Sequence, residues 1–293
     1  MKILLFGASL GGQNFIKNHA DDYEFLAIID NDSNKHGKLL DNLKIISPTR
    51  INEYPYEQII VTSMYVDSIS SQLYDLGIPE NKIQFASKNS MKVDDLPFEN
   101  KGILSKANRL IVCLSQALGD ISHYYTFGTL LGIARDGCLI PWDDDIDIAI
   151  FADDIELVQQ ALLTHVASFE ELFDIKLFVR KYSNGTPASI TLDCIENGRK
   201  LFMVNFDCMH LIEGMVKQEL NDTPIRFFVG YDELIFEETT IRVPKDYKGY
   251  LEYTYGDWCV VKRNTSFADN TISFREPLYS CKTEFLYESK KNN

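Results

Sequence analysis

The stretch that decides the fold of this chain is Thr126–Asp147, TFGTLLGIARDGCLIPWDDDID. Four aspartates fall within five positions at its end, and from Asp145 to Ile150 isoleucines alternate with acidic or small residues. This period of two predicts a half-buried strand. Because residues i and i+2 of a strand point the same way, we expect Asp145 and Asp147 to project together from one face while the isoleucines enter the core.

The crowded carboxylates of this stretch indicate a cation site. Like charges this close repel each other, so in a folded interior something must neutralise them. Mg²⁺ or Mn²⁺ suits this role, because hard cations take carboxylate oxygens and keep waters and phosphates as further ligands. We predict Asp145 and Asp147 as catalytic metal ligands. A solvated acidic turn, with or without Ca²⁺, is the alternative, and the isoleucine alternation and the upstream Gly128 and Thr129 argue against it.

The residues before the aspartates predict the start of a phosphate-binding helix. Gly128 and Thr129 lie where a helix is expected to begin, and Gly137 lies where it is expected to end. Small residues at a helix start leave backbone N–H groups free for a phosphate, so we expect Gly128 and Thr129 to bind substrate. Asp144 is predicted to join them. Arg135 is expected to hold donor phosphates through two hydrogen bonds, and its alternative role is a favourable charge at the helix C-terminus.

A third candidate carboxylate, Asp207, lies in a second alternating segment. One face of this segment carries Leu201, Met203, Asn205 and Asp207. On a neighbouring strand, Asp207 would meet Asp145 and Asp147 as a further catalytic residue and metal ligand. There it would either complete the metal site or take the proton of an acceptor hydroxyl. An edge-strand aspartate in water is the alternative.

Composition and charge narrow the functional classes. The 293 residues are 45% hydrophobic and 12% aromatic, which is enough for one large or two modest domains. The formal net charge of −14 argues against nucleic-acid binding and against adhesion to an anionic membrane. Six scattered cysteines without a Cys-x-x-Cys pair indicate a reduced, cytoplasmic protein. No apolar run is long enough for a transmembrane segment, so a lipid-linked acceptor would require transient contact with the membrane surface.

The order of strands and helices predicts two domains joined by a linker. Residues 1–87 alternate strand, helix and strand, which predicts a Rossmann-like parallel sheet. Their glycine turn departs from the dinucleotide fingerprint because Ser9 stands where the middle glycine belongs, although Asp30 occupies the place of a ribose-binding acid. We therefore expect glycines kept for the turn, with NAD binding as the alternative. Residues 88–102 are polar, contain a proline and predict a linker, and residues 103–293 form the second domain.

The second domain resembles the LicD family of phosphotransferases. The resemblance rests on Gly128–Gly132, Arg135 and Ile140–Ile148, then on Asn205–Met209, and finally on Tyr250–Leu251 and Tyr255–Trp258. Members of this family decorate bacterial surface glycans and teichoic acids with phosphocholine and related groups, and fukutin-type ribitol-phosphate transferases are more distant relatives. The chain departs from the family at Met209 and His210, which replace a Phe-Pro pair. It departs again at Phe151–Asp154, where many members place a basic residue that contacts the donor phosphate.

The first domain is similar to small Rossmann-like domains attached to enzymes of bacterial surface-polysaccharide synthesis, through Ile3–Ala8, Ile28–Asp32 and Leu76–Pro79. Together the resemblances imply an α/β protein: an N-terminal Rossmann-like parallel sheet domain plus a C-terminal α/β nucleotidyltransferase-fold domain. They imply a metal-dependent transferase that moves phosphocholine or a similar phospho-alcohol group. The donor would be CDP-activated, such as CDP-choline, and the acceptor a hydroxyl of a capsule glycan, another surface glycan or a lipid-linked glycan. The alternatives are nucleotidyl transfer to a sugar phosphate or a protein, and a non-catalytic scaffold in polysaccharide assembly. A homo-oligomer is compatible with each.

Overall fold

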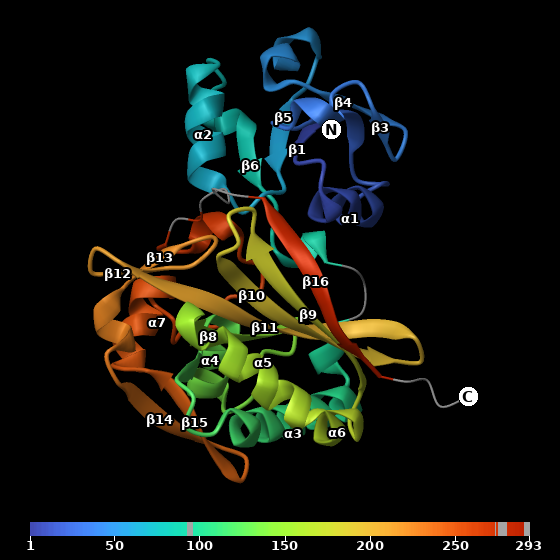
Figure 1. Ribbon diagram of the computed structural model, residues 1–293. Coiled ribbons are helices and arrows are strands. Elements are labelled where there is room, and N and C mark those ends of the chain that lie inside the picture. Colours follow the sequence, from blue (N-terminus) through green and yellow to red (C-terminus); the bar gives the residue numbers. More distant parts are fainter. Residues whose placement is uncertain (93–95, 273, 275–279, 290–293) are drawn as a thin grey trace. The chain divides into compact units, whose positions relative to one another are not determined.

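The computed structural model describes residues 1–92, 96–272, 274 and 280–289 (Figure 1). It divides into two compact units, Met1–Asp95 with Val261–Glu276, and Leu96–Val260 with Pro277–Asn293. Within the described ranges, no helix is both long and apolar enough to cross a membrane.

The first unit takes in a segment from late in the chain. The sequence places everything after the linker in one domain, but Val261–Glu276 packs with the first unit. Ser87 and Ser266 form an antiparallel bridge, and the Lys88 N–H donates to the Thr265 carbonyl over 2.8 Å. These bonds join segments far apart in sequence, so no local pattern predicts them.

The first unit is a six-stranded sheet with the order β3-β4-β2-β1-β5-β6. Every neighbouring pair is parallel except β3 and β4. The elements are β1 (Lys2–Phe6), α1 (Leu10–Asn18), β2 (Glu24–Ile29), β3 (Leu39–Leu40), β4 (Leu43–Ile46), β5 (Gln58–Val61), α2 (Val66–Asp75) and β6 (Ile83–Phe85). The central strands are continuous apolar runs, as expected where both faces of a parallel sheet are buried.

One helix covers each face of this sheet. Phe15 and Ile16 of α1 pack with one set of strand residues, whereas Ile69 and Leu73 of α2 pack with the opposite set. The predicted Rossmann-like fold of the N-terminal domain is therefore confirmed.

The predicted linker is partly structured. It contains two 3₁₀ turns, Asn89–Met91 and Pro97–Glu99, and helix α3 begins inside it at Lys101. The Asn100 side chain accepts hydrogen bonds from the N–H groups of the first turn and so fixes the start of α3. Residues 93–95 of the predicted linker lie outside the described residues.

The second unit is built on an eight-stranded mixed sheet. Its strands are β7 (His123–Tyr125), β8 (Asp145–Phe151), β9 (Asp174–Tyr182), β10 (Pro187–Glu196), β11 (Arg199–Ile212), β12 (Met215–Lys217), β13 (Asp222–Pro224) and β16 (Cys281–Glu288). Strand β11 is central, because it pairs antiparallel with β10 and β12 and parallel with β8. A separate hairpin is formed by β14 (Tyr231–Phe236) and β15 (Thr239–Pro244).

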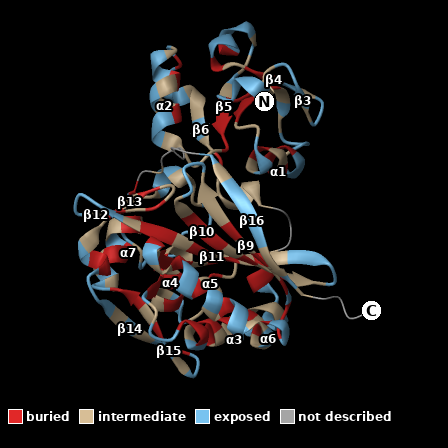
Figure 2. Cartoon of the chain, in the orientation of Figure 1, coloured by how far each residue is buried: buried red, intermediate tan, exposed pale blue. Residues whose placement is uncertain are grey.

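Helices pack against the second sheet in two groups: one group buries its apolar face, and the other places side chains beside the aspartates of β8. Helices α3 (Lys101–Leu118), α5 (Ile155–Thr164) and α6 (Val166–Glu170) gather on one side, as Figure 1 shows. Their apolar side chains share one core with Ile146, Ile148 and Ile150 of β8, each of which is fully buried. Figure 2 shows buried residues in red along the labelled strands β10 and β11 of this sheet. Helices α4 (Phe127–Asp136) and α7 (Tyr247–Tyr255) carry residues toward the aspartates of β8. The α/β fold class predicted for this half is confirmed.

Candidate active site

The parallel pairing of β8 and β11 brings the predicted aspartates to one face. Asn205 lies opposite Asp147, and Asp207 lies opposite Ala149, two positions further along the ladder. Ile146, Ile148 and Ile150 are buried in the core shared with α3 and α5, so Asp145 and Asp147 point to the opposite face of the sheet. Asp207 alternates with buried residues in the same way and shares that face.

These carboxylates perturb one another strongly. Burial raises the pKa of Asp147 well above its ordinary value, and the charges of Asp145, Asp207 and Asp143 raise it further. A hydrogen bond with Asn205 acts in the opposite direction. Burial also raises the pKa of Asp207 to about 6. A divalent cation beside these groups would favour their ionised forms, because it supplies the opposite charge that the cluster lacks.

One subset of the aspartates is close enough to share an ion. One carboxylate oxygen from each of Asp143, Asp144 and Asp145 lies within 4.8 Å of the others. Asp144 is exposed and its two neighbours are half-buried, so ligands can reach them from solvent. Oxygen donors in this arrangement fit Mg²⁺ or Mn²⁺. Within the described residues this group contains Asp145 of the three metal ligands predicted from sequence, but neither Asp147 nor Asp207. It contains Asp143 and Asp144 in their place.

The start of α4 is fastened to β8 by hydrogen bonds. The Asp147 N–H donates to the Thr129 hydroxyl over 2.9 Å, and the Thr126 N–H donates to the Asp147 carbonyl over 3.1 Å. Thr129 is buried, so its side chain positions the aspartate strand. The Asp143 carboxylate occupies the space that a side chain at Gly128 would fill. Gly128 therefore gives room for an aspartate of the cluster, and its predicted role toward substrate remains a prediction.

The end of α4 shows a different pairing for Arg135. Its guanidinium donates to the adjacent Asp136 carboxylate, with Nη2 at 2.7 Å and Nε at 3.0 Å. Residues 128 and 135 lie near opposite ends of the helix, about 10 Å apart along its axis at the usual rise per residue. The structure therefore does not bring Arg135 together with the helix start. Gly137 ends the helix in a left-handed conformation, as predicted.

Two tyrosines of α7 join the site without having been predicted as site residues. Burial raises the pKa of both Tyr250 and Tyr255, and the charge of Asp147 contributes to each shift. Tyr255 also feels Asp143 and Asp145. The sequence motif around Tyr255 could have marked it as a site residue. From the sequence, the motif indicated only a helix end at Gly256, and Gly256 does end α7. His123 is structural: burial lowers its pKa to about 4, and its ring bonds the carbonyl of Ile121.

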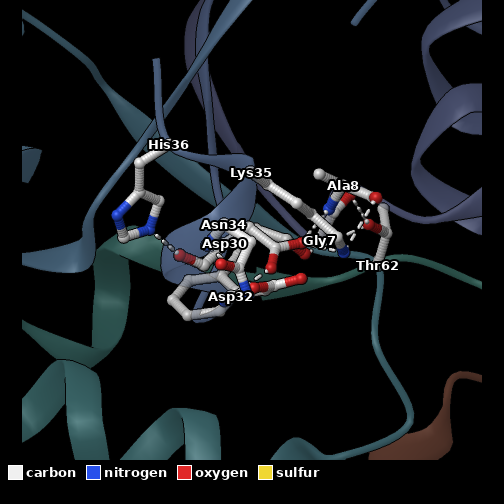
Figure 3. Close-up of polar contacts among 9 residues, drawn as sticks. Gly7, Ala8, Asp30, Asp32, Asn34, Lys35, His36 and Thr62 are labelled. Atoms are coloured by element: carbon white, nitrogen blue, oxygen red, sulfur yellow. Dashed lines mark hydrogen bonds and ion pairs between the residues drawn. The ribbon is translucent and has the colours of Figure 1, made fainter. Parts of the chain in front are cut away.

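Side chains of the first unit itself form hydrogen bonds with the backbone of its glycine turn (Figure 3). The Ala8 N–H donates to one Asp30 carboxylate oxygen over 2.8 Å, and the Lys35 ammonium reaches the same oxygen over 3.1 Å. The Asp32 N–H donates to the other oxygen over 2.9 Å. Asp30, the counterpart of a ribose-binding acid, thus already has internal partners on both oxygens.

A short segment also covers the start of α1. The Met91 sulfur lies 3.5 Å from the position of a Cβ added at Gly11. The Asn14 amide donates to the Met91 carbonyl over 3.0 Å, and the Asn18 amide donates to the Lys92 carbonyl over 2.7 Å. These contacts occupy the place where a pyrophosphate approaches a dinucleotide-binding helix. They support the interpretation that the glycines serve the turn.

Two family models match the chain. Residues 1–84 match "C2185-like, N-terminal", and residues 120–246 match "LicD/FKTN/FKRP, nucleotidyltransferase domain". Residues 120–246 are therefore a LicD-family domain. The match spans β7, α4, β8 and β11, and so includes Asp145, Asp147 and Asp207. LicD-family membership supports a transferase that acts on surface glycans.

Solved structures resemble the chain only weakly. UDP-D-quinovosamine 4-dehydrogenase from Vibrio fischeri is 21% identical, covers 29% of this chain and 74% of its own, and has a TM-score of 0.24. A myo-inositol dehydrogenase from Corynebacterium glutamicum is 14% identical, with coverages of 95% and 81% and a TM-score of 0.26. An oxidoreductase from Agrobacterium radiobacter in complex with NAD⁺, L-tartaric acid and magnesium is 10% identical, with coverages of 84% and 80% and a TM-score of 0.26. No curated protein matches.

Proposed function

We propose that the LicD-family domain transfers a phospho-alcohol group, such as phosphocholine, from a CDP-activated donor to a hydroxyl of a bacterial surface glycan. The observation that carries this proposal is the β8–β11 register, which gathers Asp145, Asp147 and Asp207 on one open face beside Asp143. Phosphoryl transfer needs charge neutralisation at the donor and a proton acceptor at the nucleophile. This face offers a carboxylate group for each task.

Asp143, Asp144 and Asp145, together with the adjacent Asp147, would hold Mg²⁺ or Mn²⁺. When bound, the ion would neutralise the donor diphosphate and offset the charge that develops on the leaving CMP. Asp207 belongs to the next strand and lies outside the group of three. We assign it to the acceptor.

In the proposed transfer, one bond forms at phosphorus, one breaks, and the released proton has an acceptor. The acceptor hydroxyl oxygen bonds to the phosphorus that carries the alcohol, while the bond from that phosphorus to the oxygen bridging to CMP breaks. Asp207 takes the hydroxyl proton and CMP leaves. The product is a phosphodiester between the alcohol and the glycan. Tyr250 and Tyr255 of α7 are buried close enough for the charges of these aspartates to raise their pKa values, and they would limit the access of water to the carboxylates.

Doubly labelled CDP-choline tests the proposal. Transfer of phosphocholine leaves the choline label on the acceptor, whereas nucleotidyl transfer leaves the cytidine label there. Phosphorus NMR with a panel of CDP-alcohols and Mg²⁺ would show CMP only if a CDP-linked donor is used. Asp145→Asn should abolish CMP release, and the matched control Asp153→Asn, at an exposed aspartate after β8, should not. Metal-dependent retention of cytidine would favour the nucleotidyltransferase alternative, and no turnover with any donor would favour a scaffold.

A further inference from the structure

A row of three polar side chains crosses the open face of the second sheet. Ser189 of β10 lies opposite Asp207 of β11 on one side and opposite Arg180 of β9 on the other. Directly opposed residues of antiparallel strands point to the same face, with Cβ atoms about 5 Å apart. The row therefore runs from the acceptor carboxylate through a hydroxyl to a guanidinium.

Arg180 has hydrogen-bonding capacity to spare. Two of its N–H donors bond to Glu219 in the turn between β12 and β13, with Nη1 to Oε2 at 2.9 Å and Nη2 to Oε1 at 3.0 Å. A guanidinium carries five such donors. The Cys281 thiol is a further hydrogen-bonding neighbour of the guanidinium, so the known partners use fewer donors than it carries. The side chain is 35% exposed, so a ligand can reach it.

Ser189, unlike Arg180, is a buried polar group whose side chain has no hydrogen-bond partner among the described residues. It is only 2% exposed, yet its hydroxyl makes no hydrogen bond within the described ranges. An unsatisfied buried hydroxyl is costly, and such groups in native proteins commonly bind a ligand or a water. Its place between Asp207 and Arg180 points to a ligand that spans this row.

The position of the row decides which substrate it would contact. Strands β8, β11, β10 and β9 are successive neighbours about 4.8 Å apart. Arg180 thus lies about 14 Å from the strand of the predicted metal ligands and about 10 Å from the strand of Asp207. It stands on the far side of Asp207 from the donor, which is the side of the acceptor.

We propose that Arg180 and Ser189 bind an acidic group of the acceptor, so that the glycan modified here carries a carboxylate or a phosphate near the hydroxyl that receives the phospho-alcohol group. This inference rests on the proposed transfer to a glycan hydroxyl. A guanidinium pairs with either oxyanion through two parallel hydrogen bonds, and the neighbouring hydroxyl adds a third. Glu219 holds the guanidinium in place for this contact.

The competing explanation is purely structural: Arg180 and Glu219 would only fasten the β12–β13 turn to β9. The two explanations differ in how the partners respond to substitution. A fastening pair loses stability to the same extent from either side and affects no ligand. A binding Arg180 is needed for the acidic ligand, whereas loss of the Glu219 charge leaves the guanidinium with one competitor fewer.

The test measures sugar binding by the full-length protein in the absence of any donor. The probes are methyl galacturonoside against methyl galactoside for a carboxylate, and glucose 6-phosphate against glucose for a phosphate. We expect at least one acidic probe to bind about tenfold or more tightly than its neutral counterpart, as a charge-assisted hydrogen bond allows. Arg180→Gln should remove this preference, Arg180→Lys should keep part of it, and Ser189→Ala should weaken it a few-fold.

Two further variants serve as controls. Glu219→Gln should keep or strengthen the preference. Lys176→Gln should leave it unchanged, because Lys176 lies on the same face of β9 but pairs with Glu288 instead. Equal binding of acidic and neutral probes, or a preference that survives Arg180→Gln, would overturn the inference. Equal losses from Arg180→Gln and Glu219→Gln would do the same.

Failure of the proposed function would look different. If no CDP donor is cleaved but the Arg180-dependent preference persists, the transfer proposal fails and the acidic-ligand site stands. If neutral glycans accept the group as well as acidic ones do, with Arg180→Gln fully active, the transfer proposal stands and this inference fails.

Discussion

Asp207→Asn should stabilise the second unit at neutral pH in the absence of divalent cations. Burial, and secondarily Glu219, raises the pKa of Asp207 from 3.8 to about 6, while Arg180 lowers it in part. Below about pH 3.8 the carboxyl is protonated in both the folded and the unfolded chain, so no penalty exists. As the pH rises towards 6, the unfolded chain ionises first and folding stability falls.

The size of this penalty follows from the difference between the two pKa values. About two pH units at 1.36 kcal/mol each give roughly 3 kcal/mol above pH 6, as an upper figure. Asparagine keeps the shape of the side chain and removes the charge. The variant should therefore gain about 1–3 kcal/mol at pH 7.5 and almost nothing at about pH 4.

Tryptophan fluorescence during urea unfolding measures this directly. Both tryptophans, Trp142 and Trp258, belong to the second unit, so the signal reports that unit alone. A chelator removes stray metal, and low protein concentration limits association near the sequence pI of 4.8. Asp153→Asn is the matched control and should change neither value. An Asp207→Asn variant that is less stable at pH 7.5, or that gains equally at both pH values, would refute the reasoning.

Five other outcomes are expected. Asp145→Asn and Asp147→Asn should each lose most metal-dependent turnover and remain folded by circular dichroism, because removing one charge relieves repulsion; full turnover in both would contradict the site. Gly132→Ala should destabilise the second unit by about 1–3 kcal/mol, because its Cβ would lie 2.6 Å from a backbone carbonyl oxygen. Gly128→Ala should instead reduce activity more than stability, because its Cβ would meet only the carboxylate of Asp143, a side chain that can move. Urea unfolding that shows Gly128→Ala to be less stable than Gly132→Ala would contradict this expectation. Arg135→Lys should leave donor affinity, measured by calorimetry, nearly unchanged, because Arg135 pairs with Asp136. A marked loss of donor affinity would show that Arg135 contacts the donor. The whole chain should bind no NAD, and micromolar binding by calorimetry would show that the glycine turn opens.

Local periodicity predicted the β8 part of the site. Alternating isoleucines between Asp145 and Ile150 indicated the strand, its buried face and the face of the aspartates, and all three agree with the structure. The same argument placed Asp207 on the face of its strand opposite Phe202, Val204 and Phe206, which are buried. Such patterns can be read without a fold, because strand geometry fixes side-chain direction over two residues.

Local periodicity could not predict which distant segments pair with each other. Nothing in the sequence around Arg180 or Ser189 marks them, since their significance comes only from the register of β9, β10 and β11. Tyr255 reaches the carboxylates because α7 packs beside them. The bridge from Ser87 to Ser266 returns a late segment to the first unit by backbone bonds, which any residue type can make.

By itself, the sequence indicated the alternating strands and helices of the first domain, the strand segments around Asp145 and Asp207, the directions of Asp145, Asp147 and Asp207, and the resemblance to the LicD family. These depend on side-chain type and short-range spacing. The tertiary structure alone decided which carboxylates meet, that Arg135 pairs with Asp136, and that Arg180 stands beyond Asp207. The physical reason is that strand order and register are set by burial of the whole apolar face at once. A shift of one residue in the pairing of β11 would turn Asp207 from its present face into the core.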